Sequence, residues 1–251
     1  MRWYGVMIAL GFLAATFAAG RLARLRQMDQ DKLLNGSLVS FMGGILGARL
    51  YFVALNWPFF SQHPQEILAT WLGGLSIHGG IVGGLIAGAL YCRLARFPFV
   101  AGCDVIACVL PLGQAVGRWG NFFNSEAFGR PVPSDFPLKL YIPPVSRPWL
   151  YRGDEYFHPT FLYESIFDLL LFFLLYFYLG ERLKRYQGVT FFAYLAAYSV
   201  GRLIIEPLRT DSIMFGTLPA PSVVSAILLL TSCLAMAALL SKYRRDEKVQ
   251  Q

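Results

Sequence analysis

Seven apolar runs, each close to 20 residues long, constrain the fold of this 251-residue chain more than any other feature. A helix of about 20 residues spans the hydrocarbon core of a bilayer, which is about 30 Å thick. A membrane β-barrel would instead show alternating segments of about ten residues, and the sequence contains none. We therefore predict an all-α polytopic membrane protein with seven transmembrane helices. The predicted spans are about 3–20, 36–57, 76–95, 98–118, 159–180, 188–206 and 219–241.

The rest of the chain indicates one membrane-embedded domain, residues 1–251, without an internal repeat of the kind found in many transporters. No small-residue cleavage site follows the run that starts at Trp3, so we expect a retained first span rather than a signal peptide. The four cysteines lie within apolar runs and form no C-x-x-C pair, so we expect neither a metal site nor a cofactor.

The basic residues orient the predicted spans, because short cytoplasmic loops carry an excess of Lys and Arg. The loops after spans one, three and five, and the C-terminal tail, hold Arg21, Arg24, Arg26, Lys32, Arg93, Arg96, Arg182, Lys184, Arg185, Lys242, Arg244, Arg245 and Lys248. The opposite loops are longer and hold fewer: Arg2, Arg130, Lys139, Arg147, Arg152 and Arg209. This predicts an outside N-terminus and a cytoplasmic C-terminus. The net charge of +7 therefore reflects membrane orientation and not nucleic-acid binding.

The same orientation places residues 119–158, between spans four and five, on the outer side. This segment is rich in proline and aromatic residues, which favours a small folded periplasmic cap over an eighth spanning element.

Ionisable residues inside the spans gather at one side. Such residues cost roughly 2.5–3.5 kcal/mol each on insertion scales, so they face the bundle interior or water. The outer half of the spans holds Arg49, Arg118, Glu164, Asp168, Arg202 and Glu206 together with His78, whereas only Asp104 lies toward the cytoplasmic half. Arg and Glu pairs of this kind can simply tie helices together. Two guanidinium groups at one depth, those of Arg118 and Arg202, also suit a phosphate, to which each can donate two hydrogen bonds.

Residues 117–130 read G-R-W-G-N-F-F-N-S-E-A-F-G-R and predict a polar, anion-binding loop at a helix end. This string resembles the prolipoprotein diacylglyceryl transferase family, whose signature G-R-x-G-N-F-x-N-x-E-x-x-G-R it matches at every fixed position. Further segments resemble the same family: W-Y-G at residues 3–5, G-A-R-L at 47–50, S-I-H-G-G at 76–80, H-P-T-F-L-Y-E at 158–164 and R-L-I-I-E with Arg209 at 202–209. In the G-A-R-L segment Ala48 stands where the family commonly has glycine.

The resemblance implies a transferase that moves the diacylglyceryl group of phosphatidylglycerol to the lipobox cysteine thiol of a preprolipoprotein. The expected products are a thioether and glycerol 1-phosphate, in the first step of bacterial lipoprotein maturation. The resemblance also implies a multi-pass protein of the bacterial cytoplasmic membrane, functional as a monomer, with its active site toward the periplasm. Its partners would be phosphatidylglycerol, other membrane lipid and the signal peptides of preprolipoproteins.

Roles for individual residues follow as hypotheses from this resemblance. Arg118 and Arg202 would hold the lipid phosphate and stabilise the leaving group, and His78 would accept the thiol proton or hydrogen-bond the headgroup. The remaining substrate-binding candidates are Tyr4, Arg49, Asn121, Asn124, Glu126, Gly129, Glu206 and Arg209. Among these, Glu206 would orient Arg202, Arg209 would add outer-face positive charge, and Arg49 would bind a second lipid or make a structural pair.

Two other classes of protein could place arginines in a membrane. A transporter or flippase for anionic lipids should carry polar residues through to the cytoplasmic half, where only Asp104 lies. A structural subunit would need close-packing glycine faces, which Gly79-Gly80 and Gly83-Gly84 provide, but packing does not account for Arg118 and Arg202.

Overall fold

The computed structural model describes residues 3–249 and divides the chain into two compact units. One unit comprises the chain up to Ala18 together with the chain from Cys103 onward, and the other comprises Ala19–Gly102.

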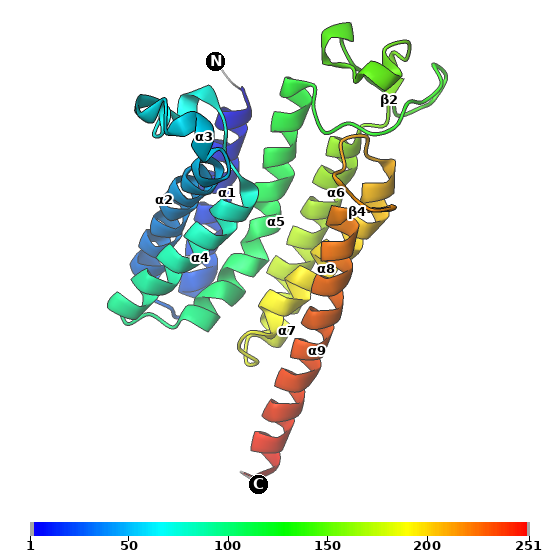
Figure 1. The fold of residues 1–251 in the computed structure, drawn as a ribbon. Helices are drawn as coiled ribbons and strands as arrows, with labels where there is room; N and C mark the ends of the chain where they lie inside the picture. The colour runs from blue at the N-terminus through cyan, green and yellow to red at the C-terminus, as the bar shows by residue number, and fades with distance from the viewer. Residues whose placement is uncertain (1–2, 250–251) are drawn as a thin grey trace. The chain divides into compact units, whose positions relative to one another are not determined.

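Within residues 3–249, seven helical segments are long and apolar enough to cross a membrane, as predicted from the apolar runs (Figure 1). They are α1 (Trp3–Leu25), α2 (Gln30–Leu55), α4 (Ile77–Leu94), α5 (Phe99–Asn124), Thr160–Leu183, Val189–Leu208 and α9 (Ala220–Val249). The fifth segment consists of α6 (Thr160–Phe173), a π-helical stretch (Leu174–Leu179) and α7 (Gly180–Leu183). The sixth consists of α8 (Val189–Ile205) and a 3-10 turn (Glu206–Leu208).

In the Ala19–Gly102 unit, α2 and α4 run side by side with their backbones in direct contact (Figure 1). Glycines on both helices make this possible. A Cβ added at Gly83 would lie 2.5 Å from the carbonyl oxygen of Gly43 and 2.9 Å from Cα of Gly47, which are clashes that neither backbone can relieve. Small residues serve this purpose in membrane helix pairs, where close van der Waals packing replaces the hydrophobic effect.

This packing predicts opposite results for two alanine substitutions on the same helix. We expect Gly83→Ala to lower the thermal stability of the detergent-solubilised protein strongly, because α4 must move away from α2. Gly80→Ala is the matched control, because a Cβ there would meet Ala48 Cβ and Gly44 O at an ordinary 3.6 Å. Alanine also favours the helical state over glycine by about 1 kcal/mol. Equal melting temperatures for the two variants would contradict the proposed basis of this interface.

In the other unit, three helices are joined by specific polar contacts. Ser165 on α6 donates a hydrogen bond to the carbonyl oxygen of Ala115 on α5 (2.9 Å), and Tyr194 on α8 donates to Gln114 on α5 (2.9 Å). The buried carboxylate of Asp104 accepts hydrogen bonds from the backbone N–H groups of Gly188 (2.6 Å) and Phe191 (2.9 Å). Asp104 therefore caps the start of α8, whose first N–H groups have no partner within the helix.

The segment after α5 folds on its own small core. Its strands β1 (Leu140–Tyr141) and β2 (Tyr156–Phe157) pair antiparallel, and Phe128, Ile142 and Phe157 are buried together beneath them. A second hairpin, β3 (Met214–Phe215) with β4 (Leu218–Pro219), lies between α8 and α9. The segment after α5 is therefore folded, although neither strand pair was predicted, and its place on the periplasmic side stays a prediction.

The predicted loop at 117–130 is wrong for its first eight residues, which belong to α5. The helix ends at Asn124 rather than near residue 118. Polar residues do not terminate a helix by themselves, and here the chain leaves the helix only at Ser125 (φ 51°) and Ala127 (φ 54°), which both adopt the left-handed conformation.

Candidate active site

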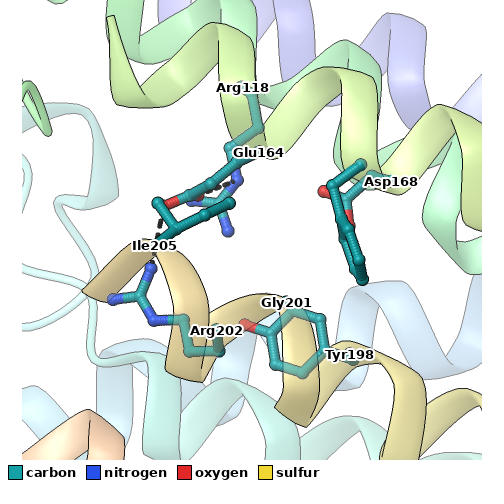
Figure 2. A pocket seen from close by; sticks show the side chains of 8 residues that line it. Arg118, Glu164, Asp168, Tyr198, Gly201, Arg202 and Ile205 are labelled. Carbon is teal, nitrogen blue, oxygen red and sulfur yellow. Dashed lines mark hydrogen bonds and ion pairs between the residues drawn. The ribbon is translucent and has the colours of Figure 1, made fainter. Parts of the chain in front are cut away.

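Three arginine side chains converge on the carboxylate of Glu164, near the end of α5, the start of α6 and the end of α8. Arg118 Nε lies 2.6 Å from Oε2 of Glu164, while Nη1 of Arg202 and Nη1 of Arg209 each lie 2.9 Å from Oε1. Figure 2 shows Arg118 and Arg202 reaching this carboxylate from opposite sides. The predicted proximity of Arg118 and Arg202 is therefore present, and Glu164, which is 5% exposed, joins them.

Two of the three arginines have a second acidic partner. Arg202 Nη2 lies 2.6 Å from Oε2 of Glu206, one turn along the chain, as the four-residue spacing predicts. Glu206 is buried and accepts a further hydrogen bond from Ser212 Oγ (2.6 Å). Arg209 donates to both oxygens of Asp211, through Nε at 3.0 Å and Nη2 at 2.7 Å. These dedicated carboxylates fix the positions of Arg202 and Arg209.

Arg209, for which the sequence predicts a positive charge at the outer face, belongs to the arginine cluster, and its side chain is only 9% exposed. Burial lowers the pKa of Arg209, but the negative charges of Glu164 and Asp211 raise it by more, so the net pKa lies above the ordinary arginine value. The guanidinium of Arg209 is thus a permanent cation of the cluster.

Close packing between α6 and α8 brings Glu164 within reach of these arginines. A Cβ at Gly201 would clash with the ring of Phe167, so only glycine lets this ring lie against the α8 backbone. The hydrogen bond from Ser165 to Ala115, described above, fixes the adjoining turn of α6 against α5. The position of Glu164 is therefore set by helix packing on both sides.

A small pocket opens beside the cluster, with about 220 Å³ of empty space when the open solvent at its mouth is included (Figure 2). Its lining includes Arg118, Glu164, Arg202, Asp168 and Tyr198. Within residues 3–249, no hydrogen bond joins Arg118 Nη1 or Nη2 to another residue. Likewise, no described residue hydrogen-bonds Oδ2 of Asp168, whose side chain is almost fully buried. The pocket thus combines cationic donors with unused hydrogen-bonding capacity, which suits an anionic group with polar substituents.

The polar residues that follow Arg118 form a separate, tight turn and do not line this pocket. The amides of Asn121 and Asn124 donate to the same oxygen of Glu126, at 3.2 and 3.3 Å, and the Glu126 N–H donates to the carbonyl oxygen of Asn121. The left-handed Ser125 and Ala127 turn the chain back so that these contacts can form. Left-handed non-glycine residues cost roughly 1–2 kcal/mol each, and such strain is concentrated at functional sites.

Gly129 lies where three backbone segments meet. Its N–H donates to the carbonyl oxygen of His158 (2.9 Å), and a Cβ here would come within 2.6 Å of His158 Cβ and 2.9 Å of the Leu208 oxygen. Its glycine character therefore reflects backbone packing beside the cluster. Tyr4 packs its ring against Gly120 on α5, and in the described part of the chain no hydrogen bond joins its hydroxyl to an arginine.

Arg49 and His78 lie in the Ala19–Gly102 unit. Arg49 is buried, and its three nitrogens donate to the carbonyl oxygens of Glu66, Ile67, Gly73 and Gly74 at 2.5–2.9 Å. Its guanidinium also lies 5.1 Å from the centre of the Phe60 ring. These contacts favour the structural alternative, in which Arg49 holds the loop between α2 and α4.

His78 is the second residue of α4, and its ring is exposed. The centre of the ring lies 6.3 Å from that of Tyr51, and no residue among 3–249 hydrogen-bonds it. Its imidazole nitrogens are therefore available to a ligand.

Comparison with known sequences gives one consistent result. A family model described as prolipoprotein diacylglyceryl transferase matches residues 1–238. A phosphatidylglycerol–prolipoprotein diacylglyceryl transferase of Trichormus variabilis is 48% identical over 229 residues, which cover 90% of this chain and 80% of the relative. Proteins of the same name from Fervidobacterium nodosum (45% identity, covering 96% and 82%) and Thermotoga maritima (44%, covering 92% and 78%) are also similar.

Proposed function

The chain belongs to the prolipoprotein diacylglyceryl transferase family and is a transferase enzyme, and from this we propose that it transfers the diacylglyceryl group of phosphatidylglycerol to the lipobox cysteine of preprolipoproteins. The observation that carries the proposal at the level of the site is the convergence of three guanidinium groups beside a pocket, with two nitrogens of Arg118 unengaged. The substrate supplies the matching group, a phosphodiester.

In the proposed reaction the cysteine sulfur forms a bond to the glyceryl carbon that carries the phosphate ester, and the carbon–oxygen bond to the phosphate breaks. The electron pair of the broken bond leaves with glycerol 1-phosphate. Arg118 and Arg202 stabilise the negative charge that develops on the leaving group, because fixed donors in a site shielded from water act most strongly on such charge. The thiol proton goes to a base, for which His78 is the candidate, with headgroup binding as its alternative role.

The test is transfer by the purified protein from phosphatidylglycerol that carries one label in the acyl chains and another in the headgroup glycerol. We expect acyl label on a lipobox peptide, equimolar release of headgroup label as glycerol 1-phosphate, and no transfer to a peptide with serine in place of cysteine. Headgroup label on the peptide, or no transfer at all, would contradict the proposal.

We also propose that the enzyme is monomeric and lies in the bacterial cytoplasmic membrane with the arginine cluster and the 125–158 segment toward the periplasm. The distribution of basic residues between the loops supports this orientation. In spheroplasts, a membrane-impermeant maleimide should label Val145→Cys, which replaces a side chain that is 93% exposed, but not Arg185→Cys in the loop after α7. The protein with only its native cysteines is the control, and labelling of Arg185→Cys alone would reverse the assigned orientation.

A further inference from the structure

The cluster contains an anion that belongs to the protein itself. Glu164 presents a carboxylate to three guanidinium groups, and guanidinium forks recognise carboxylate and phosphate oxygens by the same geometry. Its two oxygens contact Arg118 on one side and Arg202 and Arg209 on the other. A phosphodiester that enters this pocket therefore meets donors that are already occupied.

The three arginines differ in how they are held. Besides its contact with Glu164, Arg202 forms an ion pair with Glu206, and Arg209 forms one with Asp211. Among residues 3–249, Arg118 has Glu164 as its single ionic partner, and its side chain is the most exposed of the three, at 22% against 16% for Arg202 and 9% for Arg209. Arg118 is thus the arginine that can turn from the carboxylate to an incoming anion while the other two stay in place.

The charge balance of the cluster points in the same direction. Arg118, Arg202 and Arg209 face the carboxylates of Glu164, Glu206 and Asp211, so these six groups sum to no net charge, and the carboxyl group of Asp168 lines the same pocket. A phosphodiester adds a negative charge to a poorly solvated site, where like charges repel more strongly than in water. The site can accept this charge most readily when Arg118 exchanges the carboxylate of Glu164 for the phosphate.

We propose that Glu164 is a positioning residue whose carboxylate holds Arg118 in the lipid-free protein and is exchanged for the lipid phosphate on binding. The inference rests on the proposed function, because it assigns the competing anion as phosphatidylglycerol. It predicts that Glu164 lowers the apparent affinity for the lipid phosphate while it keeps Arg118 in place for the reaction.

The test is steady-state transfer by Glu164→Gln, an isosteric change that removes the competing charge. We expect the KM for phosphatidylglycerol and the inhibition constant for glycerol 1-phosphate each to fall by about three- to tenfold, since close charge pairs in shielded sites have large couplings. We expect kcat to fall as well, because Arg118 loses its single ionic partner. The matched control is Glu247→Gln, which removes an acidic partner 3.8 Å from Arg185 at an exposed site and should leave all three constants unchanged.

A purely structural role for Glu164 predicts the opposite shift, because a disordered cluster would bind both phosphates more weakly. A KM or inhibition constant of Glu164→Gln at or above the wild-type value would therefore overturn the inference. The proposed function would still stand in that case, as long as the wild-type protein itself transfers the diacylglyceryl group. Should Glu164→Gln not fold, Glu164→Asp keeps the charge but withdraws it by one methylene group from Arg118. We expect the KM for phosphatidylglycerol and the inhibition constant for glycerol 1-phosphate to fall in this variant too, but by a smaller factor. A rise in either constant overturns the inference here as well.

Discussion

Replacing Arg118 by alanine is expected to lower kcat/KM for diacylglyceryl transfer at least about hundredfold, the scale seen when one donor to a developing negative charge is removed. The structure gives the reason. Arg118 lines the pocket, and its Nη1 and Nη2 groups have no acceptor within residues 3–249, so they are the donors available to the phosphate. Arg202→Ala should have an effect of the same order, because Arg202 holds the opposite side of the cluster.

The measurement is transfer of labelled lipid to a lipobox peptide, with folding verified by thermal unfolding. Arg118→Lys separates charge from geometry, because lysine keeps the charge but cannot donate two parallel hydrogen bonds. We expect it to recover only part of the activity. Arg185→Ala removes an exposed arginine whose side chain is 67% accessible and should be silent. Wild-type activity in Arg118→Ala and Arg202→Ala would remove the phosphate-binding role from the cluster.

Replacing His78 by asparagine is expected to lower kcat by about 10²–10⁴-fold, the usual contribution of a positioned general base. Asparagine keeps a hydrogen-bonding side chain of similar reach but cannot accept a proton at neutral pH. The sign of the pH dependence follows from the role. A histidine base works only as the neutral ring, so wild-type activity should decrease toward acidic pH. Without the base, transfer depends on the fraction of substrate cysteine that is already thiolate, so the residual rate of the variant should rise with pH up to the ordinary cysteine pKa of about 8.5.

The matched control for this experiment is His63→Asn. His63 is a half-buried histidine of the same unit whose ring stacks on Phe59 (centroids 4.5 Å apart), and its replacement should change neither the rate nor its pH dependence. If His78→Asn lowers the rate but keeps the wild-type pH profile, His78 binds the headgroup and is not the base. Full turnover across the pH range would exclude both roles without affecting the family assignment.

The spans were predictable because length and hydropathy alone determine which segments can cross a bilayer. All seven predicted runs coincide with helices, yet the ends differ: α2 begins at Gln30 rather than near residue 36, and α9 continues to Val249 rather than 241. The extensions contain polar residues such as Asp31 and Arg244, which a helix accommodates readily outside the hydrocarbon. Apolar runs therefore mark the membrane-crossing part of a helix and not its full length.

The site was predictable in part. The convergence of Arg118 and Arg202 on one site agrees with counting residues along their helices, and the pair Arg202–Glu206 follows from the helical period. The joint contact of three arginines with Glu164 does not, because it depends on how α5, α6 and α8 are rotated against one another, which Gly201 and Ser165 help to fix. The helix i, i+4 spacing of Glu164 and Asp168 was a usable signal, and of these two residues only Glu164 forms close ion pairs with arginines within residues 3–249.

The glycine contacts between α2 and α4 have a consequence for what holds this helix pair together. In glycine, an α-hydrogen occupies the position that a Cβ would take. The Cα–H bonds of Gly47 and Gly79 are therefore each directed at the other residue's carbonyl oxygen, and that of Gly83 is directed at the carbonyl oxygen of Gly43. Each such weak hydrogen bond contributes about 0.5–1 kcal/mol, and hydrocarbon offers no water to compete for the carbonyl. The glycine Cα–H groups are then themselves the source of attraction between α2 and α4. Larger side chains would lose these contacts even if they filled the interface without cavities.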